Sequence, residues 1–284
     1  SSAVHAEGTT TLDGLRLSGP HSHHNVSLYL VHGKDASDTR SILTLDEALA
    51  AGKVVVFETG DVNQLAVENV SKDQTVFIHA GAIVKGGQQD RTLSNDVFLK
   101  PGSGRVPLDA FCVEAGRWEK RGTERVRVFS SAEKMLSSKE LKLAALRSRK
   151  QGEVWREVAA LQQQLSAKAD RDVTSEISAS SLQLSLENEA VEANADEYRK
   201  ELGELGFGQR DVIGYVVAIN GVINSGDVYA SHDLFARVWP SLVSAIATAP
   251  LLLTVLRHLA PVLANHVAAL TTSSTAAYVQ IAIG

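Results

Sequence analysis

Alternation of hydrophobic and polar residues dominates the first half of the chain. Val26–Val31 alternates as a half-buried strand does. Further short segments of this kind, bounded by Gly, Asp, Asn or Pro, are predicted strands: Val54–Phe57, Gln64–Asn69, Val76–Val84, Thr92–Leu99, Val106–Glu114 and Arg125–Phe129. Strands at this spacing with turn residues between them are typical of a sandwich or barrel.

The pattern changes to helical spacing after residue 137. Between residues 138 and 168 the only helix breaker is Gly152, and apolar residues repeat every three or four positions at Val154, Val158, Leu161 and Leu165. A polar stretch follows at 170–181, and a second helix is predicted at Leu182–Leu202. Both helices have a narrow apolar stripe, so we expect a helical hairpin that lies on the sheet.

Local signals fix several ends of elements. Thr44 and Glu47 form a capping box for a short helix that Gly52 terminates. Asn220-Gly221 is a strong hairpin signal, because a type I′ turn needs positive φ at both residues. It follows Val212–Ile219, which is apolar on both faces as in a buried strand. A further helix is expected from about residue 231.

These elements predict an α+β fold: a β-sandwich-like core with an inserted long helical hairpin and C-terminal helices. The core runs from Val26 to Phe129 and is completed by Val212–Tyr229. We expect a flexible arm at 1–25, one α+β domain at 26–248 with its insertion at 137–205, and a helical extension at 249–284.

Composition and charge exclude some classes of partner. Of 284 residues, 44% are hydrophobic and 21% charged, as in ordinary globular proteins. The formal net charge of −5, without a Lys/Arg-rich run, argues against nucleic acid. Leu251–Leu270 carries Arg257 and His258, so we expect no membrane insertion and instead packing on the protein or on a second copy, as in a homo-oligomer.

The single cysteine and the first residues of the chain give limited information on disulfides, metal sites and export. Cys112 is the only cysteine, which excludes an intramolecular disulfide and a cysteine-based zinc site within one chain. The start Ser1-Ser2-Ala3 fits the remainder left by a cut signal peptide and equally an arbitrary chain end. The first alternative predicts export.

The densest polar run without a packing role is Lys-Gly-Gly-Gln-Gln-Asp-Arg at 85–91. Its two glycines permit close approach of backbone to a ligand, and its polar members offer donors and one carboxylate. We take Lys85, Gln88, Asp90 and Arg91 as candidate ligand-binding residues for an anion or a sugar hydroxyl. The alternative is a glycine bulge with solvated charges between two strands.

A second candidate group follows the strand that ends near Cys112. Strand alternation puts Glu114 on the same face as Cys112, and a buried carboxylate needs a partner, which Arg91 or Arg117 can supply. Glu114, Arg117 and Trp118 are therefore also candidate ligand-binding residues. Cys112 is predicted to be a buried structural thiol, because a catalytic thiol needs a base and only His79 lies within these strands.

Three histidines near the amino terminus raise the question of a metal. His21, His23 and His24 lie close together, as in arms that bind transition metals. They have no neighbouring carboxylate, and their spacing suits a rigid site poorly. We therefore expect a solvated arm and no metal site.

Several of these segments together resemble one known family. They are Glu68–Ser71, Ala80–Arg91, Pro101–Ser103, Cys112–Trp118, Gln151–Trp155, Asn220-Gly221, and Leu234-Phe235 to Trp239-Pro240. In this order they resemble the ARG and rhodanese-phosphatase-associated protein domain, where ARG abbreviates ADP-ribosylglycohydrolase. The resemblance covers about Val26–Ala247. It implies a gene neighbourhood with enzymes that act on ADP-ribose and related compounds, and no catalytic residues.

The leading hypothesis is thus a small-molecule binding domain, for an anionic or sugar-like ligand. The resemblance suggests a nucleotide or an ADP-ribose derivative. Catalytic residues and a cofactor are not indicated. The competing hypothesis is a non-catalytic interaction or structural protein that uses the helical insertion or the C-terminal helix.

Overall fold

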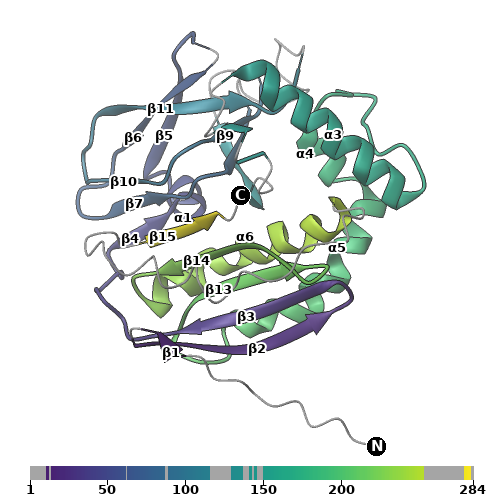
Figure 1. Cartoon of the computed structure of the whole chain (residues 1–284). Coiled ribbons are helices and arrows are strands. Elements are labelled where there is room, and N and C mark those ends of the chain that lie inside the picture. Colours follow the sequence, from purple (N-terminus) through teal and green to yellow (C-terminus); the bar gives the residue numbers. More distant parts are fainter. Residues whose placement is uncertain are drawn as a thin grey trace, which may run out of the picture. The chain divides into compact units, whose positions relative to one another are not determined.

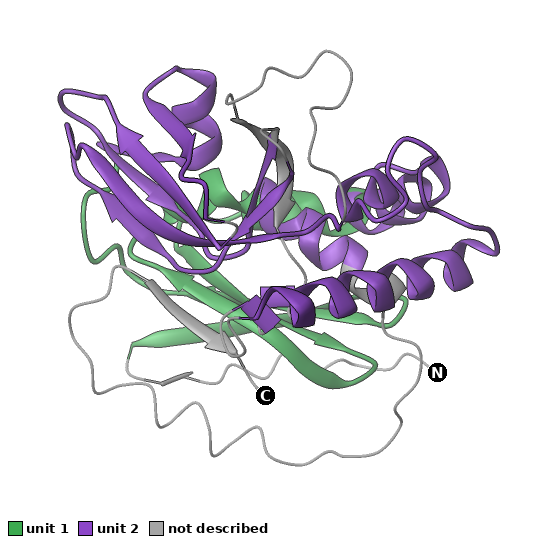
Figure 2. Cartoon of the chain, turned by 90° about the horizontal axis from the view of Figure 1, so that it is seen from above, with its two compact units in different colours: residues 1–40, 200–239, 255–284 green, residues 41–199, 240–254 purple. Residues whose placement is uncertain are grey.

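The protein has an α+β fold, as the sequence predicts, and its residues fall into two compact units. The computed structural model describes residues 11–12, 14–61, 63–86, 89–115, 129–136, 141–142, 144–145, 150–252 and 278–282 (Figure 1). Unit 1 comprises Ser1–Arg40, Lys200–Trp239 and Val255–Gly284, and unit 2 comprises Ser41–Arg199 and Pro240–Thr254 (Figure 2). The domain limits expected from the sequence stay a prediction.

Unit 1 contains one antiparallel sheet with the strand order β1-β2-β3-β13-β14-β15. Its strands are β1 Thr11–Leu12, β2 Leu15–His23, β3 Val26–His32, β13 Val212–Ile219, β14 Val222–Tyr229 and β15 Tyr278–Ala282. The central pair, β3 with β13, joins segments far apart in the sequence, with Leu30 opposite Tyr215. Asn220 and Gly221 turn the chain between β13 and β14 with φ of 53° and 77°, so the predicted hairpin is confirmed.

An aromatic core surrounds Trp239 in unit 1. Helix α6, His232–Leu252, begins after Ser231, whose hydroxyl accepts a hydrogen bond from the Leu234 amide. The Trp239 ring lies 5.8 Å from that of Tyr215 and 5.3 Å from that of Phe235. Its indole N–H donates to the carbonyl of Gly203, at 2.6 Å, in the short 3-10 helix η2 Gly203–Gly206. A Cβ at Gly206 would overlap the indole, so only glycine fits there.

Unit 2 contains two further sheets. The three-stranded sheet has the order β10-β7-β4, and the six-stranded sheet has the order β12-β8-β9-β11-β6-β5. Their strands are β4 Ile42–Thr44, β5 Val54–Glu58, β6 Gln64–Asn69, β7 Thr75–Ile78, β8 Ala82–Gly86, β9 Arg91–Leu93, β10 Val97–Leu99, β11 Arg105–Cys112 and β12 Phe129–Leu136. Helix α1, Leu45–Ala50, has the predicted capping box of Thr44 and Glu47.

The predicted helical insertion is present in unit 2. It consists of α3 Gln151–Ala169, α4 Leu182–Leu186 and α5 Glu189–Leu202, of which α5 continues into unit 1 at Lys200. The apolar stripe of α3 is buried. Gln162, also buried on α3, donates to the carbonyls of Ala179 and Ser181 and so holds the loop that leads to α4. The second predicted helix is broken before Glu189, where the Asn188 side chain accepts from the Ala190 amide.

Several expectations about the strands are wrong in detail. The sequence predicts a flexible arm that includes residues 15–23, but these residues form β2, because they pair with β3. The segments 76–84 and 92–99 are each predicted as one strand and each form two. Gly81, with φ of 85°, and the Ala80 amide, which donates to Asp96, interrupt the first. In the second, β9 ends at Leu93 and β10 begins only at Val97, although the Ser94 amide still bonds to the carbonyl of Asp109 on β11.

Two expectations about the later part of the chain also need correction. The strands at 212–229 pair with β3 and β15, within the unit 1 sheet, and not with the sheets of unit 2. Residues 278–282, predicted to belong to a helical extension, form the edge strand β15 next to β14. The predicted oligomer contact and most of the segment at 251–270 lie outside the described residues. Among the helices that are described, none is long and apolar enough to cross a membrane.

Candidate functional site

Strand register in unit 2 brings three polar side chains to one face of the six-stranded sheet. Arg91 on β9 is opposite Cys112 on β11. On the same face of β11, Leu108 is opposite Leu65, which in turn is opposite Glu58 on β5. Because directly paired residues share a face and alternate residues of a strand return to it, Glu58, Cys112 and Arg91 share that face.

Arg91 lies at the centre of this group. Its side chain is only 2% exposed, and its guanidinium donates to the Cys112 sulfur and lies 3.4 Å from a carboxylate oxygen of Glu58. Arginine remains charged at all accessible pH values, so burial requires such partners. The contact with Glu58 compensates part of the cost of burying the charge.

The environment of Cys112 keeps its thiol protonated. Burial raises the pKa of Cys112 to about 11, and the Arg91 charge, which favours the thiolate, offsets only part of that effect. A nucleophilic cysteine needs a lowered pKa. The prediction of a buried structural thiol agrees with this placement. His79, the base considered for such a thiol, bonds through Nδ1 to the carbonyl of Ala80 at 2.7 Å.

Three further buried polar side chains belong to the same region of unit 2. Gln89, Asp90 and Glu114 are each 0% exposed. The carbonyl of Asp90 accepts from the Val113 amide at 3.0 Å, so the two strand ends that carry these residues are adjacent. We define the Arg91 cluster as Glu58, Gln89, Asp90, Arg91, Cys112 and Glu114.

Gln89 differs from its neighbours in the cluster. Neither its side-chain nitrogen nor its side-chain oxygen has a hydrogen-bond partner among the residues that the structure describes. A buried polar group without a partner costs about 1–3 kcal/mol, and native proteins contain few of them. Both the donor and the acceptor of the Gln89 side-chain amide are thus unsatisfied within the described part of the chain.

The helical insertion packs at the edge of the cluster. The Gln151 side chain, at the start of α3, bonds to both the amide and the carbonyl of Cys112, at 2.9 and 2.8 Å. The amide of Leu182 at the start of α4 donates to the carbonyl of Val113. The insertion therefore replaces a neighbouring strand at the end of β11 and fixes the backbone that carries Cys112 and Glu114.

Only some of the site residues predicted from the sequence lie together in the structure. Asp90, Arg91 and Glu114 are in the Arg91 cluster. Lys85 instead forms an ion pair with Glu187, the residue that ends α4, at 2.5 Å. The other three predicted residues lie outside the described residues: Gln88, Arg117 and Trp118.

Sequence reasoning missed Glu58 and the structural role of Gln151. Alternation could have placed Glu58 on the buried face of β5, because Val54 and Val56 are buried and Glu58 is the next residue on that face, but it could not have shown the contact with Arg91. The pairing of Arg91 with Glu114 stays a prediction, and the structure adds Glu58 as a carboxylate in contact with Arg91. No local signal could have found Gln151, since its contact with Cys112 spans 39 residues.

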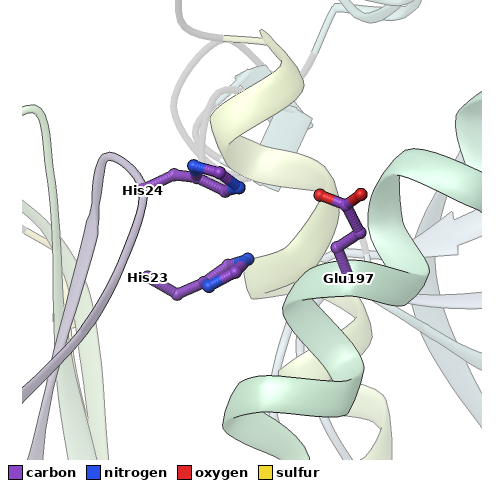
Figure 3. Close-up of side chains that lie close together, drawn as sticks. All are labelled: His23, His24 and Glu197. Atoms are coloured by element: carbon purple, nitrogen blue, oxygen red, sulfur yellow. The ribbon is translucent and has the colours of Figure 1, made fainter.

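The histidines near the amino terminus are in unit 1. His21 and His23 are on β2, and His24 begins the turn to β3 with φ of 50°. The rings of His23 and His24 have centroids 4.2 Å apart, edge to face (Figure 3). Glu197, the third side chain drawn in that picture, belongs to α5 in unit 2. The expected solvated arm is thus corrected, because these histidines are part of a paired hairpin.

Comparison with known protein families gives one match. Residues 14–272 match the model of the ARG and Rhodanese-Phosphatase-superfamily-associated Protein domain. The match extends beyond both ends of the resemblance found in the sequence. No curated protein and no solved structure matches the chain.

Proposed function

The chain belongs to the family of ARG and Rhodanese-Phosphatase-superfamily-associated Protein domains, and on this premise we propose that its Arg91 cluster binds a small polar molecule. The ligand class is a nucleotide or an ADP-ribose derivative. The family description supports this class, since ARG stands for ADP-ribosylglycohydrolase. The proposal assigns binding to the cluster, and no reaction.

The observation that carries the proposal is the unpaired amide of Gln89. It is fully buried, and neither of its polar atoms is bonded within the described residues. A primary amide offers two N–H donors and a carbonyl acceptor side by side. The edge of a nucleobase, or a pair of ribose hydroxyls, has the complementary donors and acceptors. Binding of such a group removes a cost that the free protein bears.

Charge at the cluster supports a ligand with mixed polarity. The buried guanidinium of Arg91 can bind phosphate or hydroxyl oxygens, and the carboxylates of Glu58 and Glu114 can accept from hydroxyl groups. A compound with both ribose and phosphate groups uses both kinds of partner. A purely apolar ligand would use neither.

The alternative role as an interaction protein has less support. It requires an exposed apolar face on the helical insertion or on the C-terminal helix, and most of the latter segment lies outside the described residues. The apolar residues of α3 are buried within unit 2 instead: Val154, Val158, Leu161 and Leu165. Among the described residues from α3 to α5, Ile177 in the loop after α3 is a single large apolar residue that is exposed, and not a patch.

A thermal-shift titration with ADP-ribose, AMP, ribose 5-phosphate and inorganic phosphate tests the proposal. At a hundred times the dissociation constant, a bound ligand adds about 2.7 kcal/mol to apparent stability. We expect at least one organic probe to stabilise the wild-type protein. Replacement Gln89→Leu, of similar size, should abolish that shift, and because it removes an unpaired buried amide it should not lower the stability of the free protein.

The control is Gln163→Leu, at an exposed position of α3, which should keep the full shift. A probe that stabilises wild type and Gln89→Leu equally would contradict the proposal, as would the absence of any shift with all four compounds. Loss of stability in the free Gln89→Leu protein would instead identify Gln89 as a structural residue.

A further inference from the structure

A second group of polar side chains, in unit 1, has the connectivity of a nucleophile, a base and an acid. The Ser18 hydroxyl oxygen lies 2.7 Å from Nε2 of His32. Nδ1 of the same ring lies 3.0 Å from Oδ1 of Asp211. Serine–histidine–aspartate centres are recognised by this chain of contacts and not by the order or spacing of the residues in the sequence.

The register of the sheet explains how these residues meet. Ser18 on β2 is opposite Leu30, and His32 follows two residues later on the same face of β3. Asp211 directly precedes β13, and its carbonyl accepts from the Gly33 amide just beyond β3, at 2.8 Å. The three side chains therefore come from two neighbouring strands of one sheet and from the residue before the third, within one compact unit.

Two irregularities of the sheet flank the group. The register of β2 with β3 shifts after Ser18, and that of β13 with β3 shifts between Val212 and Gly214, next to His32. Such bulges change the direction of individual side chains and are enriched next to active sites. After Ser18 the chain requires a glycine, because Gly19 has φ of 107° and a Cβ there would lie 2.8 Å from the carbonyl of Leu28.

The polarity of the contacts fixes the direction of proton transfer. An ionised carboxylate only accepts hydrogen bonds, so Nδ1 of His32 carries a proton and donates it to Asp211. In the neutral ring Nε2 is then the acceptor and receives the Ser18 O–H. The hydrogen bond with His32 lowers the pKa of Asp211 below its ordinary value, which keeps the carboxylate ionised. Arg16 holds the other carboxylate oxygen at 3.1 Å.

The histidine of the group is buried and the serine is partly exposed, as in a nucleophilic centre. The His32 ring is only 2% exposed, so solvent does not compete for its two nitrogens. Ser18 is partly exposed, and its contact with the ring is only partly buried. A histidine buried for packing alone needs partners for its ring nitrogens, but it does not need one of them to be a hydroxyl at the surface.

We propose that Ser18, His32 and Asp211 form a nucleophilic centre that hydrolyses a small carboxylic ester. His32 Nε2 takes the Ser18 hydroxyl proton while Ser18 Oγ bonds to the carbonyl carbon of the ester. The bond from that carbon to the leaving oxygen breaks, and the alcohol departs with the proton from His32. Water then attacks acyl-Ser18, again with His32 as base, which releases the carboxylic acid and restores Ser18.

Covalent labelling with an alkyl fluorophosphonate tests this assignment, with the labelled residue identified by peptide mass spectrometry. The Ser18 oxygen displaces fluoride from phosphorus in the same way that it attacks an ester. We expect labelling at Ser18, and none at Ser22, an exposed serine of the same strand whose hydroxyl contacts Ser27. Hydrolysis of 4-nitrophenyl acetate should be lost in Ser18→Ala and retained in Ser22→Ala.

Two further variants separate the centre from a merely structural arrangement. His32→Gln removes the base, and we expect at least a hundredfold slower labelling of Ser18, as general bases contribute about 10²–10⁴-fold. Asp211→Asn should also slow labelling strongly. Because the Asp211 side chain is half-exposed, this variant should fold even if His32→Gln does not. Arg40→Gln, at an exposed arginine of unit 1 that pairs with Asp38, should label at about the wild-type rate.

The proposal is overturned if Ser18 labels no faster than Ser22 in the wild-type protein. It is also overturned if folded Asp211→Asn labels at the wild-type rate, since the contact with His32 would then serve structure alone. Binding of ADP-ribose at the Arg91 cluster is measured independently of both results.

Discussion

At the scale of single residues, burial decides which chemistry the Arg91 cluster can perform. Strand alternation in the sequence predicts Cys112 and Glu114 on one buried face, and both are buried in the structure. It could not predict Glu58 as the carboxylate that contacts Arg91, because that contact spans 33 residues and depends on the order of strands in the sheet. A thiol with a raised pKa next to a buried arginine is suited to structure and binding, and not to nucleophilic attack.

The thiol of Cys112 predicts a particular pH dependence of stability. The folded-state pKa, about 11, lies above the ordinary value of 9.0, so the folded protein keeps a proton that the unfolded chain loses. Stability is therefore lost as pH rises through this window, by up to about 2.7 kcal/mol at 1.36 kcal/mol per pKa unit. We expect the unfolding free energy of wild type to fall between pH 9 and 11 relative to that of Cys112→Ala.

Urea denaturation at pH 7, 9 and 11 measures this difference. The difference in unfolding free energy between wild type and Cys112→Ala should change little between pH 7 and 9. Below the ordinary pKa, the thiol stays mostly protonated in both the folded and the unfolded state. A difference that stays flat up to pH 11 would show that the thiol ionises as easily in the folded protein as in the unfolded chain. Native Cys112 should also react slowly with a thiol reagent and react completely after denaturation.

Arg91 should contribute strongly to stability. Its replacement by alanine removes the positive charge that lies next to the Glu58 carboxylate. Loss of one partner of a buried ion pair costs about 3–5 kcal/mol of stability. The control is Arg105→Ala on the same sheet, an exposed arginine that lies 4.0 Å above the Phe57 ring and should cost about 0.5–1 kcal/mol. Chemical denaturation compares the two, and equal losses would contradict a buried ion pair.

At the scale of elements, the sequence predicted well wherever a local signal determines the structure. The capping box at Thr44 and the hairpin at Asn220-Gly221 are such signals, and both are confirmed. The long predicted strand at 76–84 failed where a glycine interrupts it, at Gly81, next to the Ala80 amide that donates to Asp96. That interruption depends on a hydrogen bond to a distant residue, which hydrophobic alternation does not reveal.

The docking of α3 provides a test at this scale. The Gln151 amide bonds to the backbone of Cys112 on both sides, so Gln151→Ala leaves a backbone N–H and a carbonyl without those bonds. We expect a loss of about 1–3 kcal/mol in unfolding free energy. Gln163→Ala, on the exposed side of the same helix, should change stability by less than about 0.5 kcal/mol. A similar small effect of both replacements would mean that Gln151 does not hold the helix on β11.

At the scale of the whole molecule, the unit 1 sheet is the feature that the sequence could not show. The doubly apolar pattern of Val212–Ile219 predicted a buried strand, and the structure has it between β3 and β14. Its partner β3 lies about 180 residues earlier, as the pair of Tyr215 with Leu30 illustrates. Pairing over such a separation depends on the global fold, so the alternation pattern alone left the strand order open.

This pairing predicts the outcome of cleavage in the loop between α3 and α4. A nick at residues 170–181, where Ile177 is exposed, separates β3 from β13 in the sequence but not in the sheet. The two fragments should therefore elute together in native size-exclusion chromatography and separate only in denaturant. Fragments that separate without denaturant and remain folded would contradict a sheet that both share.

The proposed binding site depends on a contact between the buried amide of Gln89 and the ligand. The side-chain N–H₂ resonances of Gln89, assigned by their disappearance in Gln89→Leu, report on this contact directly in a titration of ¹⁵N-labelled protein with ADP-ribose. We predict a saturable shift of these two resonances, while those of Gln163 stay unchanged. Gln89 resonances that remain in place up to millimolar ADP-ribose, AMP and ribose 5-phosphate would contradict the claim.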